Sequence, residues 1–212
     1  MSKSTITIPR LKLGYANTIV LSASKVSIDG PALVGLVGAN GAGKTTLLQA
    51  MAGLLHPTEG VVKFNKHDVH EPSVRSRMIF VPDRPVLFND LAIVDTLNHV
   101  LKLTGASEPT PLGGSLWEAF ELDPLKRRFP SQLSRGQRQK AALAIALSRP
   151  AEVLLLDEPT IALDSGARTA LAEVLQKYSH DYLIIASSHD DDIIQAADVI
   201  ARIDDGVLAI DE

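Results

Sequence analysis

The fold of this chain is decided by the stretch Gly38-Ala39-Asn40-Gly41-Ala42-Gly43-Lys44-Thr45. It matches the pattern G-x-x-x-x-G-K-[ST] of a phosphate-binding loop at every fixed position. Glycine lacks a Cβ and accepts positive φ, so such a loop turns tightly and brings several backbone N–H groups close to one anion. A helix that begins at the loop adds the partial positive charge of its N-terminus. The pattern predicts that Lys44 reaches the β- and γ-phosphates and that the Thr45 hydroxyl binds Mg²⁺.

The segments on either side of the loop have the character that this motif requires. Residues 32–37 form a short apolar run, as expected of a buried parallel strand. After the loop, apolar side chains recur at helical spacing at Leu47, Leu48, Met51 and Leu55. The alternative is a glycine turn before an ordinary helix, and the strand–loop–helix context favours the nucleotide-binding interpretation.

The composition is that of an ordinary globular protein. The 212 residues suffice for one large domain, and the net charge of −4 does not indicate wholesale binding of nucleic acid. Without cysteine there is no disulfide framework and no cysteine nucleophile, which fits a reducing cytosol. We find no secretory signal and no apolar run near the roughly 20 residues that a membrane helix needs. We therefore expect a soluble chain whose membrane role, if any, comes through a partner.

The rest of the chain alternates between strand and helix patterns. Residues 4–30 and 57–67 are expected to form an antiparallel sheet, and Gly105 to Gly114 are expected to form a loop within a helical region at 90–150. The other expected elements are buried strands at 78–82, 153–157 and 183–187, and helices at 136–149, 166–178 and 190–197. This alternation predicts an α/β fold with a largely parallel sheet covered on both faces.

Two carboxylates end the apolar run at residues 153–156. In open α/β sheets ligands bind at the carboxyl ends of the strands, so Asp157 is placed to hold Mg²⁺ or its water. Glu158 suits a general base on an attacking water. The alternative is a strand that simply stops at the turn of Pro159, and the phosphate-binding loop favours the catalytic interpretation.

Two further polar stretches each have two interpretations. In Leu133-Ser134-Arg135-Gly136-Gln137, Ser134 is an N-cap for the following helix or part of an anion site, and the stretch alone does not separate the two. The run Asp190-Asp191-Asp192 resembles a metal cluster, but acids in the first turn of a helix are the simpler interpretation because the helix dipole favours them there.

Together these motifs resemble the nucleotide-binding subunit of an ATP-binding cassette (ABC) transporter. The resemblance covers nearly the whole chain in the family's motif order. Its motifs are Walker A at 38–45, the signature LSGGQ spelled LSRGQ at 133–137, Walker B and its glutamate at 153–158, the D-loop at 162–164, and the switch histidine at 187–190. It implies a P-loop NTPase core, mostly a parallel sheet flanked by helices, with an N-terminal antiparallel β subdomain and an inserted α-helical subdomain. We expect one domain over 1–212, with the core and β subdomain at 1–87 and 150–212 and the helical subdomain at about 88–149.

The resemblance also implies a role for each site residue. Glu158, His189 and Lys44 are the expected catalytic residues, and Tyr15 would stack on adenine. The expected phosphate contacts come from Gly38, Ala39, Asn40, Gly41, Ala42, Gly43, Lys44, Thr45 and Thr46, and the Mg²⁺ ligands from Thr45, Asp83 and Asp157. From the signature, Ser134, Gly136 and Gln137 would act on the nucleotide of the opposite subunit, and Asp164 would meet that subunit's Walker A region. The remaining histidines, His56, His67, His70, His99 and His180, are interpreted as structural or surface residues.

The implied function is an ATPase, with ATP and Mg²⁺, that powers transport through a separate membrane permease by head-to-tail dimerisation. A second ABC domain, identical or a paralogue, is the other expected partner, and direct contact with nucleic acid is not expected. This places the chain at the cytoplasmic face of the membrane. One alternative is a soluble ABC ATPase in a process such as iron–sulfur cluster assembly. Another is a non-hydrolysing binding module, which the presence of the expected catalytic residues Glu158 and His189 disfavours. The cargo and the direction of transport depend mainly on the permease.

Two positions depart from the family pattern. Asp83 follows Val81-Pro82 where the family usually has glutamine, and Arg135 replaces the first glycine of the signature pair. An ionised carboxylate can bind Mg²⁺ but donates no hydrogen bond, and it adds negative charge near the triphosphate. Our hypothesis is that Asp83 keeps the Mg²⁺ role and changes the rate or the coupling, whereas Arg135 leaves function intact.

We predict that Asp83→Gln alters the dependence of ATP turnover on Mg²⁺ concentration, because the change removes a carboxylate and its charge from the phosphate site. The measurement is ATP turnover across a Mg²⁺ titration for the native protein and the variant. Superimposable curves would remove any special role for Asp83.

Overall fold

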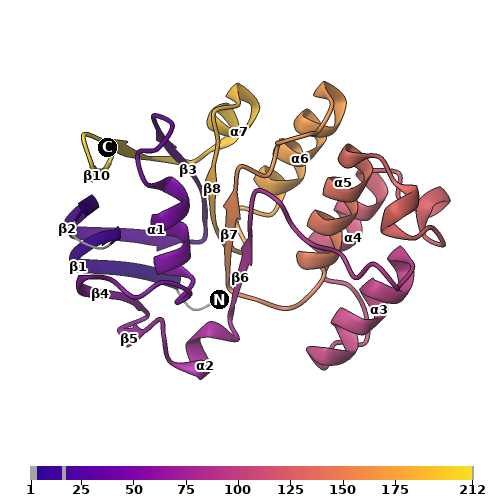
Figure 1. Ribbon diagram of the computed structural model, residues 1–212, viewed down its shortest axis with the longest axis horizontal. Coiled ribbons are helices and arrows are strands. Elements are labelled where there is room, and N and C mark those ends of the chain that lie inside the picture. Colours follow the sequence, from indigo (N-terminus) through magenta and orange to yellow (C-terminus); the bar gives the residue numbers. More distant parts are fainter. Residues whose placement is uncertain (1–3, 16–17, 212) are drawn as a thin grey trace.

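The computed structural model describes residues 4–15 and 18–211, and its centre is one curled sheet (Figure 1). Within these residues the sheet has ten strands in the order β5-β4-β1-β2-β10-β9-β3-β8-β7-β6. The strands are β1 (Ser4–Tyr15), β2 (Thr18–Gly30), β3 (Ala32–Gly38), β4 (Glu59–Phe64), β5 (His67–Asp68), β6 (Met78–Val81), β7 (Val153–Asp157), β8 (Leu183–Ser187), β9 (Val199–Asp204) and β10 (Val207–Ile210). The helices are α1 (Lys44–Met51), α2 (Pro72–Arg75), α3 (Ile93–Leu103), α4 (Pro111–Ala119), α5 (Arg135–Ala146), α6 (Ser165–Lys177) and α7 (Asp191–Ala196), with 3-10 turns at Asp123–Leu125 and Pro130–Gln132.

The strands β9, β3, β8, β7 and β6 are parallel, as predicted for a nucleotide-binding core. Their side chains are buried on both faces. On β7, Val153 and Leu155 pack into the core around α1, whereas Leu154 and Leu156 pack under α5, α6 and α7. This two-sided burial explains why these strands read as unbroken apolar runs rather than as alternating patterns.

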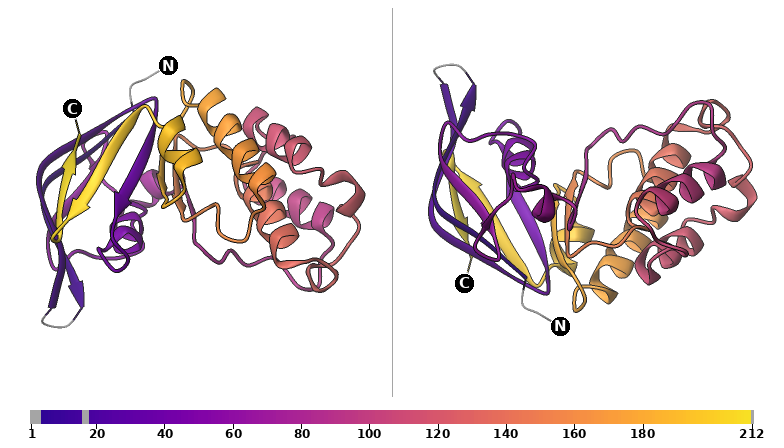
Figure 2. Two further views of the ribbon diagram at one scale, coloured as in Figure 1. Left: turned by 90° about the horizontal axis from the view of Figure 1, so that it is seen from above. Right: turned by 90° about the horizontal axis from the view of Figure 1, so that it is seen from below.

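The strands β1, β2 and β4 pair antiparallel, as predicted from residues 4–30 and 57–67. They do not form a separate sheet, because β10 joins β2 to β9 and makes the two parts continuous. Helix α1 contacts β1, β3, β4 and β7 and so lies on the inside of the curl. Figure 2 shows the antiparallel strands at one end of the molecule and α3, α4 and α5 at the other. The division into subdomains with the stated boundaries stays a prediction.

The hairpin of β9 and β10 was missed by the sequence interpretation. Its turn is Asp205-Gly206, with φ of 47° and 72°, and Leu208 pairs with Ile203 across it. An Asp-Gly pair between alternating apolar residues is a strong hairpin signal, because both positions need positive φ. The signal was therefore present in the sequence.

Two expected boundaries were wrong. Helix α1 ends at Met51, since Gly53 takes a φ of 66°, and Leu55 packs against the core from beyond the helix. Helix α4 begins at Pro111 and so includes Gly113 and Gly114, which we expected in a loop. Thr110 caps this helix by accepting from the Gly113 N–H at 3.1 Å. The cap and the proline at the first helical position outweigh the low helix propensity of the glycines.

Gly113 allows α4 to approach the end of α5, and we predict that a side chain there destabilises the fold. A Cβ at Gly113 would lie 2.5 Å from Ser148 Cα, whereas one at Gly114 would meet nothing within 4 Å. Gly113→Ala should lower the free energy of unfolding by about 1–3 kcal/mol, and Gly114→Ala should raise it by roughly 0.5–1 kcal/mol. Urea denaturation measures both, and equal stability of the two variants would contradict this packing.

Candidate functional site

The phosphate-binding loop lies between β3 and α1, as predicted. Gly41 and Gly43 have φ of 80° and 100°, in the region that favours glycine. A Cβ at Gly43 would also lie 3.1 Å from Val20 Cγ1, so β2 supports the loop from below. Helix α1 begins at Lys44, which places its N-terminal N–H groups beside the loop. The Thr45 side chain is exposed at this edge, whereas Thr46 is buried.

The three expected catalytic side chains come together from three elements. Lys44 Nζ donates to the Gly38 carbonyl at 2.8 Å and lies 2.8 Å from His189 Nε2. Glu158 Oε1 lies 3.7 Å from Lys44 Nζ and 3.4 Å from His189 Nε2. Lys44 and Glu158 are mostly buried, with 7% and 18% of their side chains exposed, whereas His189 is 48% exposed. The carboxylate of Glu158, the ammonium of Lys44 and the imidazole of His189 are therefore in contact at the carboxyl edge of the sheet.

Ser187, at the end of β8, holds both acids in place. Its hydroxyl donates to Asp157 Oδ1 at 2.8 Å and accepts from the Glu158 N–H at 2.9 Å. Ser187 and Asp157 are 0% and 1% exposed. Glu158 has a φ of 45°, a strained backbone for a residue with a Cβ, and such strain persists only where the surroundings impose it. The sequence interpretation did not assign Ser187 this role. The signal was a polar residue that ends the neighbouring parallel strand, in register with Asp157.

The oxygen ligands at this edge fit a Mg²⁺ ion that arrives with a nucleotide. Asp157 offers a buried carboxylate and Thr45 an exposed hydroxyl. In the described part of the chain no three His, Cys, Asp or Glu residues form a group that could hold a metal by themselves. Mg²⁺ bound by phosphates is held by few protein ligands, so this sparse donor set suits it.

Asp83 follows β6, and 46% of its side chain is exposed. Its Oδ2 lies 3.7 Å from Arg84 Nε. It lines a cavity of about 460 Å³ with Arg135 and Arg138, between the end of β6 and the start of α5. Its contact with Mg²⁺ stays a prediction. The side chain of Tyr15, the expected adenine contact at the end of β1, lies outside the described part of the structure.

The signature stretch forms the start of α5. Ser134 Oγ accepts from the Gln137 N–H at 3.1 Å, and Gln137 Oε1 accepts from the Ser134 N–H at 3.0 Å. This reciprocal capping box confirms Ser134 as the N-cap of α5, and the anion site stays a prediction. A Cβ at Gly136 would lie 2.7 Å from the Ala162 carbonyl oxygen, so this glycine allows the D-loop backbone to approach α5. Contact of these residues with another subunit's nucleotide stays a prediction.

Asp164 links the D-loop to two helices of its own subunit. It accepts from the Ala167 N–H at 2.9 Å and so caps α6, and Lys140 of α5 lies 2.9 Å from its other oxygen. The hydrogen bond from Lys140, and then that from Ala167, hold the pKa of Asp164 below its usual range. Farther along, Asp191 and Asp192 lie in the first turn of α7, which confirms the helical interpretation of the acidic run.

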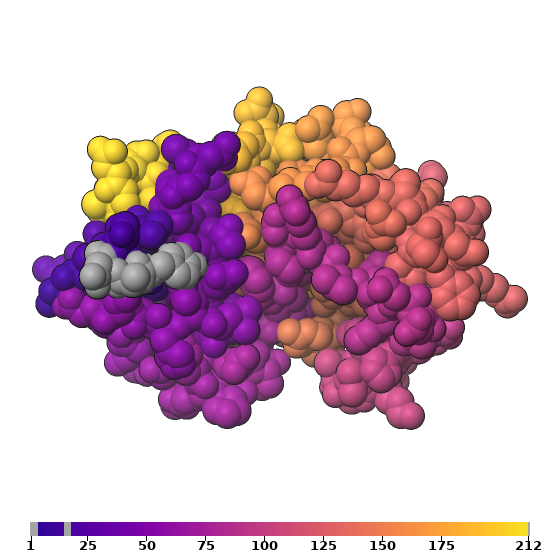
Figure 3. Space-filling model, in the orientation of Figure 1, coloured from indigo at the N-terminus to yellow at the C-terminus, as the bar shows by residue number. Residues whose placement is uncertain are grey.

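A cavity of about 530 Å³ opens where these elements meet. It is lined by Asn40 of the phosphate-binding loop, Glu158, the D-loop with Ala162, Arg168 of α6 and His189. The fold and this site define a P-loop nucleotide-binding protein. In the space-filling view these segments meet along the upper side of the molecule (Figure 3).

The family model described as ABC transporter matches residues 21–161, so the chain belongs to this family. It is 36% identical over 187 residues to the sulfate/thiosulfate import ATP-binding protein CysA 1 of Rhizobium meliloti (strain 1021), covering 83% of this chain and 54% of that protein. It is likewise 36% identical over 210 residues to CysA of Salmonella typhi, covering 94% and 57%. The chain thus spans about half the length of these curated relatives.

A solved structure described as the ATP binding subunit of an ABC transporter superposes with a TM-score of 0.83 at 26% identity, over 97% of this chain and 89% of that one. Among the described residues, no helix combines the length and the apolar character that crossing a membrane requires.

We predict that Ser187→Ala lowers both stability and ATP turnover, because it leaves a buried carboxylate oxygen and the Glu158 N–H without their partner. The expected loss is about 1–3 kcal/mol in the free energy of unfolding. The control is Ser148→Ala. Ser148 is equally buried, but its hydroxyl donates only to the Ala144 carbonyl at 2.7 Å. Urea denaturation and phosphate release measure the two effects, and normal turnover in Ser187→Ala would contradict the role of this serine.

Proposed function

We propose that this chain is the ATP-hydrolysing subunit of an ABC transporter and powers transport through a separate membrane permease. The observation that carries the proposal is the meeting of Lys44, Glu158 and His189 within 4 Å of one another. Together they supply a general base, a phosphate-binding cation and an imidazole at the site where a triphosphate would bind.

In the proposed reaction, the loop amides and Lys44 hold the β- and γ-phosphates. Glu158 accepts a proton from a water molecule, whose oxygen attacks the γ-phosphorus as the bond to the β,γ-bridging oxygen breaks, and ADP and phosphate are released. His189 contacts the γ-phosphate and orients the water toward Glu158, 3.4 Å from its own Nε2. Bound Mg²⁺, held by Thr45, Asp157 and Asp83, would neutralise phosphate charge.

A second ABC domain completes the proposed site. Ser134 is exposed at the N-terminus of the 12-residue helix α5, where unpaired N–H groups favour an anion. With Gly136 and Gln137 it would face the nucleotide of the other domain, and Asp164 would face that domain's Walker A region. ATP would thus close two domains head to tail, and hydrolysis would release them. Differential binding of ATP and ADP supplies the work.

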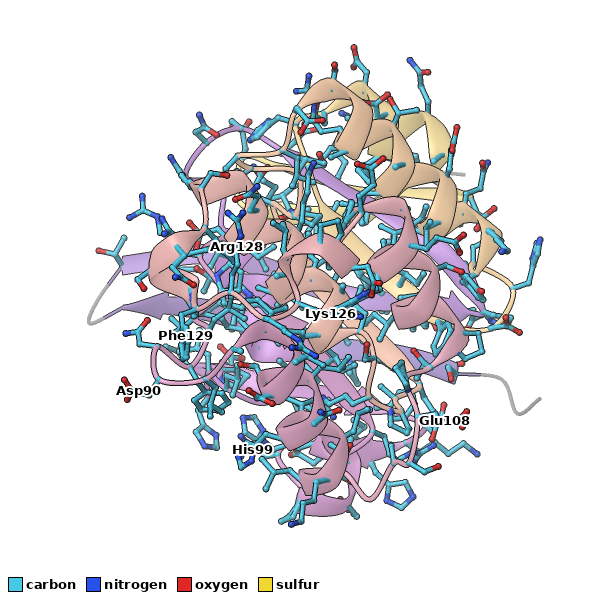
Figure 4. The ribbon with its side chains drawn as sticks, turned by 90° about the vertical axis from the view of Figure 1, so that its right-hand side faces the viewer. Asp90, His99, Glu108, Lys126, Arg128 and Phe129 are labelled. Carbon is cyan, nitrogen blue, oxygen red and sulfur yellow. The ribbon has the colours of Figure 1, made fainter. Side chains whose placement is uncertain are left out.

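The end of the molecule that carries α3, α4 and α5 has a surface suited to contact with the permease. Val86 and Phe88, between β6 and α3, are 91% and 50% exposed, and Phe88 meets His99 of α3 edge to face. Val86 and Phe88 both line a cavity of about 290 Å³, together with other residues of this loop and mainly apolar side chains of β6, α3 and α5. Figure 4 views this end, with His99 and the exposed Phe129 on its surface. Exposed apolar side chains rimmed by polar ones are typical of protein-binding surfaces.

The proposal places the chain at the cytoplasmic face of a membrane, on its permease. The relatives named for sulfate and thiosulfate import favour an import complex, and they favour transport over iron–sulfur cluster assembly. The proposal leaves the choice of cargo to the permease.

The central test is Glu158→Gln. The amide cannot accept the proton from water, so ATP hydrolysis should fall by roughly 10²–10⁴-fold while ATP binding persists. The ATP-bound protein should then accumulate as a dimer, measured by light scattering, whereas Lys44→Ala should lose ATP binding and stay monomeric. Normal hydrolysis by Glu158→Gln would exclude Glu158 as the base.

The trapped Glu158→Gln protein also tests the partner. Used as bait in detergent-solubilised membranes, it should retain a multi-helix membrane protein. Exclusively soluble partners would instead favour the iron–sulfur alternative.

A further inference from the structure

Arg168 lies in the catalytic cavity without a part in the reaction described above. It comes from the first turn of α6 and lines the same cavity of about 530 Å³ as Glu158 and His189. Its Nη1 donates to Asp190 Oδ1 at 3.1 Å, and Asp190 directly follows His189 in the chain. An ion pair therefore joins α6 to the segment that carries the switch histidine.

The Asp190 side chain pairs with Arg168 and does not cap the helix that follows it. It stands at the N-cap of α7, where an aspartate normally accepts from a backbone N–H of the first turn. Here the side chain makes no capping hydrogen bond, and its carboxylate accepts from Arg168 instead. The ion pair is thus favoured over the cap. Through Asp190, Arg168 is therefore in contact with the segment that carries His189.

The His189 segment, residues 187–190, is also attached through its backbone and through the imidazole itself, which lies 2.8 Å from Lys44 Nζ. The Asp190 N–H donates to Ser188 Oγ at 2.9 Å, and the Ser188 N–H donates to the Leu36 carbonyl at 3.3 Å. The second of these bonds reaches β3, and the Ile194 N–H of α7 donates to the Asp190 carbonyl at 3.3 Å. Arg168 adds an ion pair from α6 at the residue next to His189, whose imidazole lies beside Lys44 and Glu158.

One hydrogen-bond donor of Arg168 is unpaired, which a purely structural role does not explain. Its Nε is buried and has no hydrogen-bond partner among the described residues. A buried donor without an acceptor lowers stability, and such a group in a folded protein calls for a reason other than stability. Its position in the catalytic cavity supplies one.

At its other end, Arg168 is connected to the D-loop. Its backbone N–H donates to the Asp164 carbonyl at 3.0 Å, and the Asp164 side chain caps α6 and pairs with Lys140 of α5. Two ion pairs and the first turn of one helix therefore connect the signature helix to the segment of His189.

We propose that Arg168 is a positioning residue for His189. Its ion pair with Asp190 holds the imidazole against Lys44 and Glu158, and α6 couples that position to the D-loop. The inference deepens the function proposed above, and its kinetic part rests on that function.

The kinetic test is Arg168→Gln, which keeps a polar side chain and removes the charge. Turnover at saturating ATP should fall by about tenfold while KM for ATP changes less than about twofold, since the lost contact orients a group that acts in the transition state. The melting temperature should not fall, because the variant also removes the unpaired Nε. Arg168→Lys should recover part of the turnover, since an ammonium group can still pair with Asp190.

The matched control is Arg202→Gln, which breaks another arginine–aspartate pair, Arg202 with Asp211 at 3.0 Å on β9, away from the cavity. It should leave turnover and KM unchanged. A fall in turnover as large as that of Arg168→Gln would mean that the effect is general, and it would overturn the proposal.

A second readout does not depend on hydrolysis. The imidazole signals of His189 in a ¹H–¹⁵N NMR spectrum are identified by their loss in His189→Gln. They should shift in Arg168→Gln and stay in place in Arg202→Gln. Unmoved His189 signals, or moved signals with native turnover, would overturn the positioning role. A native protein without ATPase activity would instead defeat the proposed function, and the NMR comparison alone would then decide whether Arg168 positions His189.

Discussion

The parallel pairing of β3 with β8 and of β8 with β7 is the constraint on which the site depends. Parallel strands end at one edge, so the residues that follow them meet although they are far apart in the chain. Lys44, Glu158 and His189 are brought together in this way. A shift of register by one residue would move every side chain of these strands into the opposite core and would displace the polar residues that follow the strands. Packing far from the nucleotide site thus sets its geometry.

Local contacts then refine what the strand pairing brings together. Ser187 joins Asp157 to the backbone of Glu158, and Arg168 holds the segment next to His189. Each of these contacts places a polar or charged group in a partly or fully buried setting, where an unpaired partner is unfavourable. The acids and the histidine are therefore held by neighbours that carry no chemistry of their own.

Much of the fold was predictable from the sequence because its signals are local. The strand–loop–helix of residues 32–51 and the cap at Ser134 depend on neighbours a few residues away, and both were confirmed. The start of α4 was wrong because glycine propensity was given more weight than the cap at Thr110. The roles of Ser187 and Arg168 were missed because they depend on pairs 30 and 22 residues apart, which no local pattern encodes. The expected metal and nucleotide contacts, including Asp83 and Tyr15, stay predictions.

The capping box at the start of α5 has a consequence for how the signature stretch meets a phosphate. Ser134 accepts its capping bond at Oγ, so the hydroxyl proton takes no part in the cap and is free to be donated. Gln137 uses its carbonyl oxygen on the Ser134 N–H, so its amide N–H groups take no part in the capping box. The bonds that start the helix therefore also orient its donors before any anion arrives, and the entropy of fixing these side chains is already lost on folding.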